Sequence, residues 1–149
     1  MDALGFECLT NPEPQRGLLS SFQVGAAALL AGGEEGPGAV FTLADMPLVS
    51  IDTHQHLLAL GPETEAAQCR YGEGEAAVSA PPLLLRADLL PALLALPAAD
   101  IGPRALLRGR TVTLLPRPAA ELLDVDTPQA LAQAAAYLGK SWGERSESG

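Results

Sequence analysis

The sequence carries little positive charge, and this shortage excludes two classes of partner. Nine Lys and Arg residues stand against 18 Asp and Glu in 149 residues, a formal net charge of −9. Binding to nucleic acid or to an anionic membrane needs clustered basic side chains, so we expect neither partner. A small phosphate can still be bound, because a few backbone N–H groups and one or two arginines suffice to hold it.

Cysteine and long apolar runs are also scarce. Cys8 and Cys69 are the only cysteines and form no closely spaced pair, which indicates reduced thiols in a cytoplasmic protein rather than a disulfide framework. The start, MDALGFECL, is unlike a signal peptide. The longest apolar stretches, residues 24–31 and 83–99, are too short or are interrupted by charge and proline, so we expect no transmembrane helix.

Aliphatic residues are abundant in the sequence. Hydrophobic residues make up 48% of the chain and aromatic residues only 4%, whereas 18% of the residues are charged. This composition and length predict one domain with a real core rather than a disordered chain. Short apolar runs alternate with helical patterns, which is typical of an α/β fold with a mainly parallel sheet. The predicted strands cover residues 6–9, 39–43, 76–78, 83–85, 111–115 and 121–125. The predicted helices cover residues 22–31, 52–60, 87–96, 102–107 and 128–138. Their expected N-caps are Ser20 or Ser21 for the first, Asp52 or Thr53 for the second and Thr127 for the last, and Pro91 and Pro128 are expected in first turns.

Two aspartates are notable for their positions relative to predicted strands. Asp45 follows the buried run at residues 39–43, and Asp124 lies in the run at 121–125, just before a helix. Ligands of open α/β sheets bind beyond the carboxyl ends of the strands, and two carboxylates meeting there favour Mg²⁺. The alternative is that Asp45 only begins a turn and that Asp124 or Asp126 only caps a helix.

Four segments in order resemble signature segments of the MobA-like nucleotidyltransferases, the superfamily that includes the molybdenum cofactor cytidylyl- and guanylyltransferases. The segments are residues 11–25 (NP…GLLSSFQVG), 43–47 (LADMP), 99–107 (ADIGPRALL) and 124–128 (DVDTP). LADMP and DVDTP are most similar to the cytidylyltransferase type.

The resemblance implies a three-layer, Rossmann-like α/β fold with a mainly parallel sheet. It also implies transfer of a nucleotidyl group, CMP more than GMP, from CTP or GTP to a phosphorylated acceptor such as molybdopterin or the molybdenum cofactor. Mg²⁺ would be the cofactor. The implied site residues are Asp45 and Asp124 as catalytic metal ligands, Asp126 as a further metal ligand, Ser20 and Ser21 near the nucleotide, and Asp100 and Arg104 on the acceptor side.

The chain departs from the family at its start, where the glycine-rich LAAGxSxRxGxxK segment that holds the triphosphate has no counterpart. Residues 1–139 would then be the C-terminal two thirds of the family domain, followed by a disordered tail at 140–149. Three interpretations stay open: an enzyme, a non-catalytic homologue that acts as a binding or interaction module, or a chain whose start is assigned too late. A missing central strand would leave a sheet edge for a partner chain or a second copy to complete.

Other reactive side chains favour structural roles. His54 and His56 fall in a predicted helix, where residues two apart point in different directions and do not share a metal. Cys69 has no nearby base in the sequence. Arg104, Arg108 and Arg110 form the densest basic segment, which suits either a phosphate or a solvated face.

Overall fold

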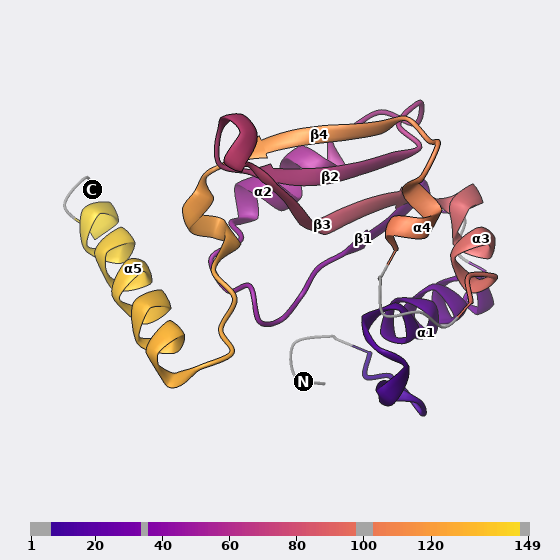
Figure 1. The fold of residues 1–149 in the computed structure, drawn as a ribbon, viewed down its shortest axis with the longest axis horizontal. Coiled ribbons are helices and arrows are strands. Elements are labelled where there is room, and N and C mark those ends of the chain that lie inside the picture. The colour runs from indigo at the N-terminus through magenta and orange to yellow at the C-terminus, as the bar shows by residue number, and fades with distance from the viewer. Residues whose placement is uncertain (1–6, 34–35, 98–102, 147–149) are drawn as a thin grey trace. The chain divides into compact units, whose positions relative to one another are not determined.

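The computed structural model of the chain describes residues 7–33, 36–97 and 103–146, and its side chains as far as residue 139 (Figure 1). Its helices are η2 (Pro14–Arg16), α1 (Leu18–Ala31), α2 (Ile51–Leu58), η3 (Gly74–Ala76), η4 (Ala87–Leu89), α3 (Leu90–Leu94), α4 (Arg104–Leu107), η5 (Ala119–Leu122) and α5 (Pro128–Ser146). Its strands are β1 (Gly38–Phe41), β2 (Ala66–Tyr71), β3 (Val78–Arg86) and β4 (Val112–Arg117).

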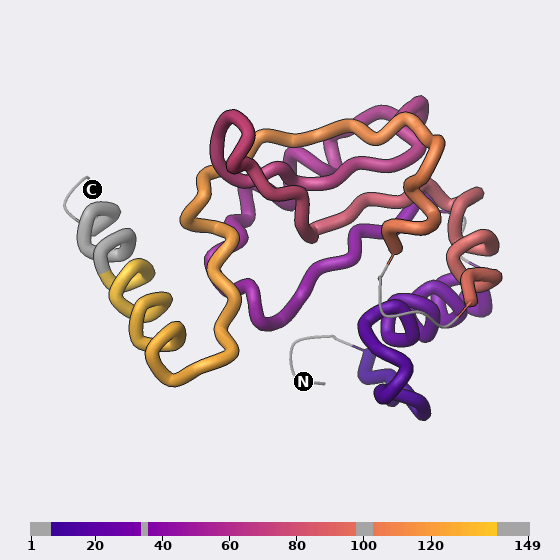
Figure 2. The backbone as a smooth tube through the Cα atoms, in the orientation of Figure 1, coloured from indigo at the N-terminus to yellow at the C-terminus, as the bar shows by residue number. Residues whose placement is uncertain are grey.

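The four strands form one sheet in the order β1-β3-β2-β4. Only residues 72–77 join β2 to β3, as the tube of Figure 2 shows, and so short a connection makes this pair antiparallel. Ala87 N, after β3, donates to Pro37 O, before β1, so β3 also runs against β1. Gly72 N, after β2, donates to Arg117 O at the end of β4, so β2 and β4 are parallel. Three strands therefore share one direction, as the sequence predicted, and β3 runs against them.

The chain divides into two compact units, the first made of Met1–Ala39, Pro62–Ala66 and Leu85–Val112. In this unit α1 lies against α3 (Figure 1). The side-chain amide of Gln23 on α1 donates to the carbonyl oxygens of Leu93 and Leu96, at 3.1 and 3.0 Å. Leu93 O also accepts from Leu96 N at 3.3 Å, and the glutamine adds a side-chain donor to the carbonyls at the end of α3 and so joins the two helices.

The second unit consists of Val40–Gly61, Ala67–Leu84 and Thr113–Gly149. Its core packs Leu57 of α2 against Ala67, Cys69 and Tyr71 of β2, and all four side chains are at most 1% exposed. Met46, from the segment that follows β1, completes this cluster. Alternate residues of β2 therefore face α2, as expected for a strand with one face on a helix.

Several strands and helices predicted from the sequence are present in the structure, but they begin or end at other residues than predicted. The runs at 39–43 and 111–115 are β1 and β4. The hydroxyl of Thr127 accepts a hydrogen bond from Ala130 N at 3.1 Å, the N-cap expected before Pro128. The helix expected to end at Gly139 continues to Ser146 and includes residues 140–146 of the predicted tail. A helical glycine costs only about 1 kcal/mol, which its neighbours offset.

Other element predictions were wrong. Residues 121–125 form no strand, because η5 covers Ala119–Leu122 and Val125 makes a lone backbone bond to Asp45 O. The predicted strand at 83–85 lies within β3, which begins at Val78, whereas Ala76 of the predicted strand at 76–78 belongs to η3. β2 was not predicted. Residues 7–9 form no strand, and Phe6 lies outside the described residues.

Helix starts also differ from their predictions. α1 begins at Leu18, with Gly17 as N-cap, because the Ser20 hydroxyl bonds back to Gly17 O at 2.8 Å inside the first turn. α2 takes Ser50 as its N-cap rather than Asp52 or Thr53. The predicted helix at 87–96 is shorter and consists of η4 and α3, with Pro91 in the first turn of α3 as expected.

Candidate functional site

Asp45 lies in the turn that follows β1. Met46 N donates to Leu43 O at 3.3 Å, and the neighbouring side chains Met46 and Leu48 are only 4% and 6% exposed. The Asp45 side chain is exposed. The two apolar neighbours thus anchor the turn in the core of the second unit and leave the carboxylate in water.

The segment that carries Asp124 and Asp126 runs beside this turn. Val125 N donates to Asp45 O at 2.8 Å, and this single bond joins segments about 80 residues apart in sequence. Asp124 and Asp126 are both exposed. The structure therefore brings together three of the aspartates that the sequence singled out, without the predicted strand at 121–125.

The carboxylates act on one another. Burial raises the pKa of Asp124, and the negative charges of Asp45 and Asp126 raise it further. A cation placed between these groups would relieve the repulsion, and carboxylate oxygens are ligands that Mg²⁺ prefers. Within the described residues, no three His, Cys, Asp or Glu side chains form a ready ligand set. Water and substrate phosphates would have to complete the coordination.

Ser20 and Ser21 lie in the first turn of α1, in the other unit. The Asn11 side-chain amide donates to both hydroxyls, at 2.8 and 3.0 Å. Ser20 is buried and also bonds to Gly17 O, whereas Ser21 is exposed. Ser20, Asn11, Arg16 and Gln23 line a hollow of about 290 Å³. Of the two serines, Ser21 has the hydroxyl that is open to a ligand.

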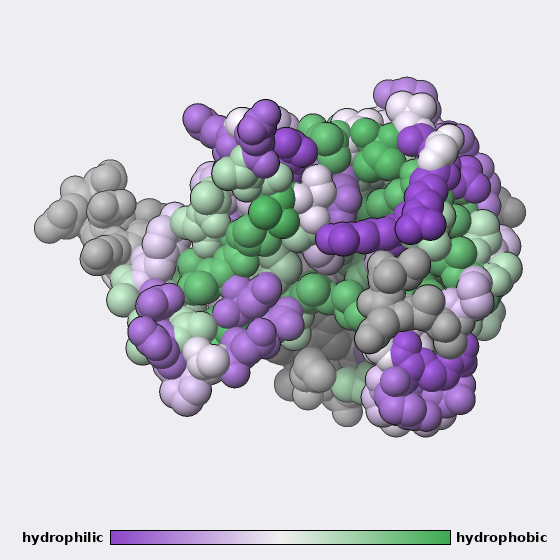
Figure 3. All heavy atoms as spheres, in the orientation of Figure 1, coloured by the Kyte–Doolittle hydropathy of each residue, from purple (hydrophilic) through white to green (hydrophobic). Residues whose placement is uncertain are grey.

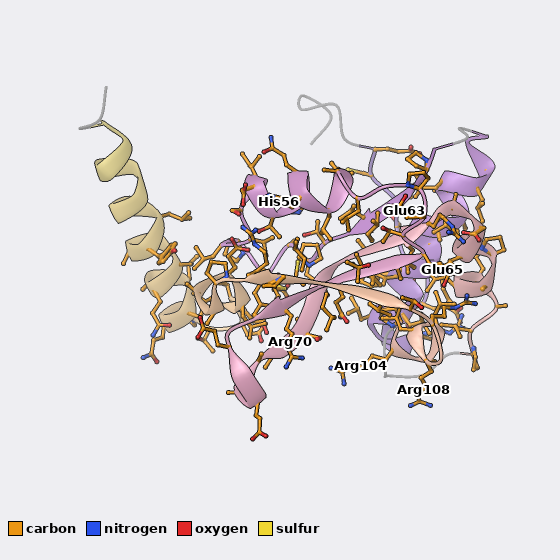
Figure 4. The ribbon with its side chains drawn as sticks, turned by 90° about the horizontal axis from the view of Figure 1, so that it is seen from above. His56, Glu63, Glu65, Arg70, Arg104 and Arg108 are labelled. Atoms are coloured by element: carbon orange, nitrogen blue, oxygen red, sulfur yellow. The ribbon has the colours of Figure 1, made fainter. Side chains whose placement is uncertain are left out.

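The predicted acceptor-side residues are placed only in part. Arg104 begins α4, and its side chain, like that of Arg108 one turn later, is exposed and projects from the ribbon (Figure 4). Asp100 lies outside the described residues.

A buried polar network in the second unit escaped the sequence analysis. Thr53 on α2 donates its hydroxyl proton to Glu121 of η5 at 2.7 Å, and the two residues are 0% and 6% exposed. Arg117, at the end of β4, lies 3.5 Å from the other Glu121 oxygen and donates to Asp52 at 2.7 Å. These side chains link α2, β4 and η5.

Two carboxylates, Asp52 and Glu121, share the single arginine of this network, Arg117. The hydrogen bond from Arg117 lowers the pKa of Asp52, and His56 lies 3.2 Å from the same carboxylate oxygen. The Arg117 Nε atom is buried and has no hydrogen-bond partner. The four-residue spacing of Arg117 and Glu121 was the available signal, but it indicates a pair only on a helix, and a strand was predicted there.

The two histidines both lie on α2, as predicted. His54 contacts Ser50 O through Nδ1 at 2.9 Å and Thr42 Oγ1 through Nε2 at 3.3 Å. Both ring nitrogens therefore have protein partners, which fits a structural role for His54.

Another hollow, of about 390 Å³, lies in the second unit beside η5 and α5. Leu48, Leu122, Leu123 and Tyr137 are among its lining residues. Figure 3 shows apolar side chains exposed on this side of the molecule. The lining is mostly apolar, and Gln133 and Tyr137 are its polar residues. Among the described residues, no helix is both long and apolar enough to cross a bilayer.

Comparison with known proteins gives one family and two solved structures. Residues 1–117 match the model of the MobA-like NTP transferase domain. The crystal structure of Rv0371c from Mycobacterium tuberculosis H37Rv is similar, with 28% identity and a TM-score of 0.61 over 77% of this chain and 57% of that one. The structure of Rv0371C in complex with manganese, from the same organism, is also similar, with 26% identity and a TM-score of 0.58 over 74% of this chain and 59% of that one.

The chain thus spans less than two thirds of the length of these two structures. No curated protein matches the sequence.

Proposed function

Because the chain belongs to the MobA-like NTP transferase family, we propose that it serves nucleotidyl transfer from a nucleoside triphosphate to a phosphorylated acceptor. CMP transfer is favoured over GMP transfer by the LADMP and DVDTP segments, and molybdopterin or the molybdenum cofactor is the proposed acceptor. The observation that carries the proposal is the meeting of the Asp45 turn with the segment of Asp124 and Asp126.

Each site residue has a proposed role. Asp45 and Asp124 hold Mg²⁺, with Asp126 as a further ligand. When bound, the cation would neutralise triphosphate charge and stabilise the charge that builds at the attacked phosphorus. The exposed Ser21 hydroxyl contacts the nucleotide, and Ser20 orients the Asn11 amide beside it. On the acceptor side, Arg104 contacts a phosphate, and Asp100 completes that subsite.

A divalent-cation titration tests the metal site. Mn²⁺ binding to the full chain is followed by the loss of the free-ion EPR signal, with and without CTP. Loss of an outer-shell partner alone typically weakens metal binding about 10- to 100-fold, so Asp45→Asn is expected to cost at least about 10-fold. Glu75→Gln removes the same charge from an exposed residue of η3 in the same unit and should leave binding unchanged. Equal binding by Asp45→Asn and wild type would refute the site.

A binding or interaction role is the second candidate, and the sheet supports it. Among the strands of the described residues, β1 lies at one edge of the sheet with β3 beside it, and an edge strand is where a further strand can be added. We propose that a partner chain or a second copy completes the sheet there. Light scattering after size-exclusion chromatography tests this role, and a clean monomer that captures no partner would argue against it. The proposed location is the cytoplasm, in keeping with two free cysteines.

A further inference from the structure

The two segments that carry the candidate metal ligands have little to hold them in register. Asp45, Asp124 and Asp126 are all exposed and lie outside helices and strands. Val125 N donates to Asp45 O and joins the two segments. The buried Met46 and Leu48 anchor the Asp45 turn, but this anchoring and a single backbone bond do not fix the separation of the exposed carboxylates, because exposed side chains can adopt several rotamers.

The elements next to these segments are fixed by contrast. The Asp45 turn leads into α2 through its N-cap Ser50, and the Asp124 segment leaves η5 directly. Thr53 on α2 and Glu121 on η5 are joined by the 2.7 Å hydrogen bond in the interior of the unit. This bond therefore connects the two elements, α2 and η5, that adjoin the segments carrying the candidate metal ligands.

The hydroxyl of Thr53 is itself held in place. Ser50 Oγ accepts from Thr53 N at 3.2 Å and lies 3.0 Å from Thr53 Oγ1. If the Ser50 hydroxyl donates to Thr53 Oγ1, the Thr53 hydroxyl is free to donate its own proton to Glu121. The three contacts of Ser50, Thr53 and Glu121 then each have one donor and one acceptor. The N-cap of α2 at Ser50 and the Thr53–Glu121 bond between α2 and η5 are thus parts of one hydrogen-bond network.

Arg117 offsets the free-energy cost of burying the Glu121 carboxylate. A carboxylate that is 6% exposed needs both a counter-charge and hydrogen bonds. Arg117 Nη2, 3.5 Å from Glu121 Oε1, supplies the charge, and its contact with Asp52 ties the same guanidinium back to α2. The side chain of Arg117 is 12% exposed, so solvent screens this arrangement little.

We infer that Thr53 and Glu121, with Arg117, are positioning residues that set the separation of Asp45 from Asp124 and Asp126 and so the size of the cation the site prefers. This inference rests on the proposed function, because it assigns a role to residues behind the proposed metal site. Mg²⁺ and Mn²⁺ demand short, regular coordination, whereas the larger Ca²⁺ accepts flexible ligands. A loosened site therefore loses Mn²⁺ affinity more than Ca²⁺ affinity.

The test compares Mn²⁺ and Ca²⁺ binding across a small set of variants, at a temperature where circular dichroism shows each one folded. Thr53→Val keeps the shape of the side chain and removes the hydroxyl, and it is expected to weaken Mn²⁺ binding about 10- to 100-fold. Ca²⁺ affinity, measured by competition against Mn²⁺, should fall less, so the ratio of the two dissociation constants shifts. Thr53→Ser retains the hydroxyl and should stay close to wild type.

Glu121→Gln provides an independent measurement if Thr53→Val does not fold. It keeps an oxygen that can accept from Thr53 and removes the charge that Arg117 balances, and it should shift the Mn²⁺-to-Ca²⁺ ratio in the same direction. Wild-type binding in both variants, or an equal loss for both cations, would overturn the positioning role. Loss of Mn²⁺ binding in Asp45→Asn with an unchanged Thr53→Val overturns this inference alone, whereas no Mn²⁺ binding by the wild type overturns the proposed function.

Discussion

Gly38 at the start of β1 allows a close approach of two strands, and the cost of an added methyl group there can be worked out from the structure. A Cβ at Gly38 would collide with the carbonyl oxygen of Leu85 and lie 3.0 Å from Arg86 Cα and 3.1 Å from the Leu85 carbonyl carbon. Ordinary contacts between carbon atoms begin near 3.5 Å. The colliding atoms are backbone atoms of β3, so no side chain can rotate away.

Gly38→Ala therefore forces β1 and β3 apart. Overpacking of this kind costs about 1–3 kcal/mol, which lowers the melting temperature of a domain this size by about 2–4 °C per kcal/mol. Gly139→Ala is the matched control, because an added Cβ in this helix meets no atom within 4 Å. Removing a helical glycine stabilises by up to about 1 kcal/mol.

Urea titrations of the two variants should therefore move in opposite directions from the wild-type midpoint. The backbone conformation of Gly38 does not itself require glycine, since its φ is not positive. Any loss of stability in Gly38→Ala thus reports the space between β1 and β3. A wild-type midpoint for that variant would refute the close approach of these strands.

Two further predictions concern the buried side of β2. Cys8 is exposed and Cys69 is buried, so a thiol reagent should modify one cysteine at once and the second only after denaturant is added; rapid reaction of both would contradict the packing of β2 against α2. Burial raises the pKa of Cys69 above its ordinary 9.0 and that of Tyr71 above its ordinary 10.0. At a pH between the ordinary and the raised pKa of each group, the unfolded chain ionises while the folded chain does not. The free energy of unfolding should therefore be fully present below pH 9.0 and fall as the pH rises further. A urea midpoint that stays unchanged from about pH 8 to pH 11 would count against this burial.

The sequence was informative where local chemistry decides the structure. The apolar run at 39–43 favours a strand, which β1 covers in part, and Thr127 before Pro128 is a helix start that depends on no distant contact. The position of Asp45 just after that run was also readable, since the polar residue follows directly on the apolar ones. The motif order then indicated the family to which the chain belongs.

Long-range contacts decided the features that the sequence concealed. Glu121 reads as part of a strand by its neighbours, yet its partners Thr53 and Arg117 come from other elements and hold it in a helical turn. β2 follows a stretch rich in Gly, Glu and Pro, yet Gln68 and Arg70 alternate with the buried Ala67, Cys69 and Tyr71, and this alternation was an available signal for a strand with one buried face. Pairing with β3 and β4 on both sides, rather than intrinsic propensity, makes this segment a strand.

The antiparallel pair of β2 and β3 occupies the middle of the sheet, with β1 and β4 at its edges. Residues 72–77 close a small loop between β2 and β3, whereas the longer segments 42–77 and 72–111 separate β1 from β3 and β2 from β4. Small loops close with less loss of chain entropy, so the hairpin is expected to assemble first. It would then serve as the template on which each outer strand docks in a separate step, and the turn that carries Asp45 would take its place only after β1 has docked.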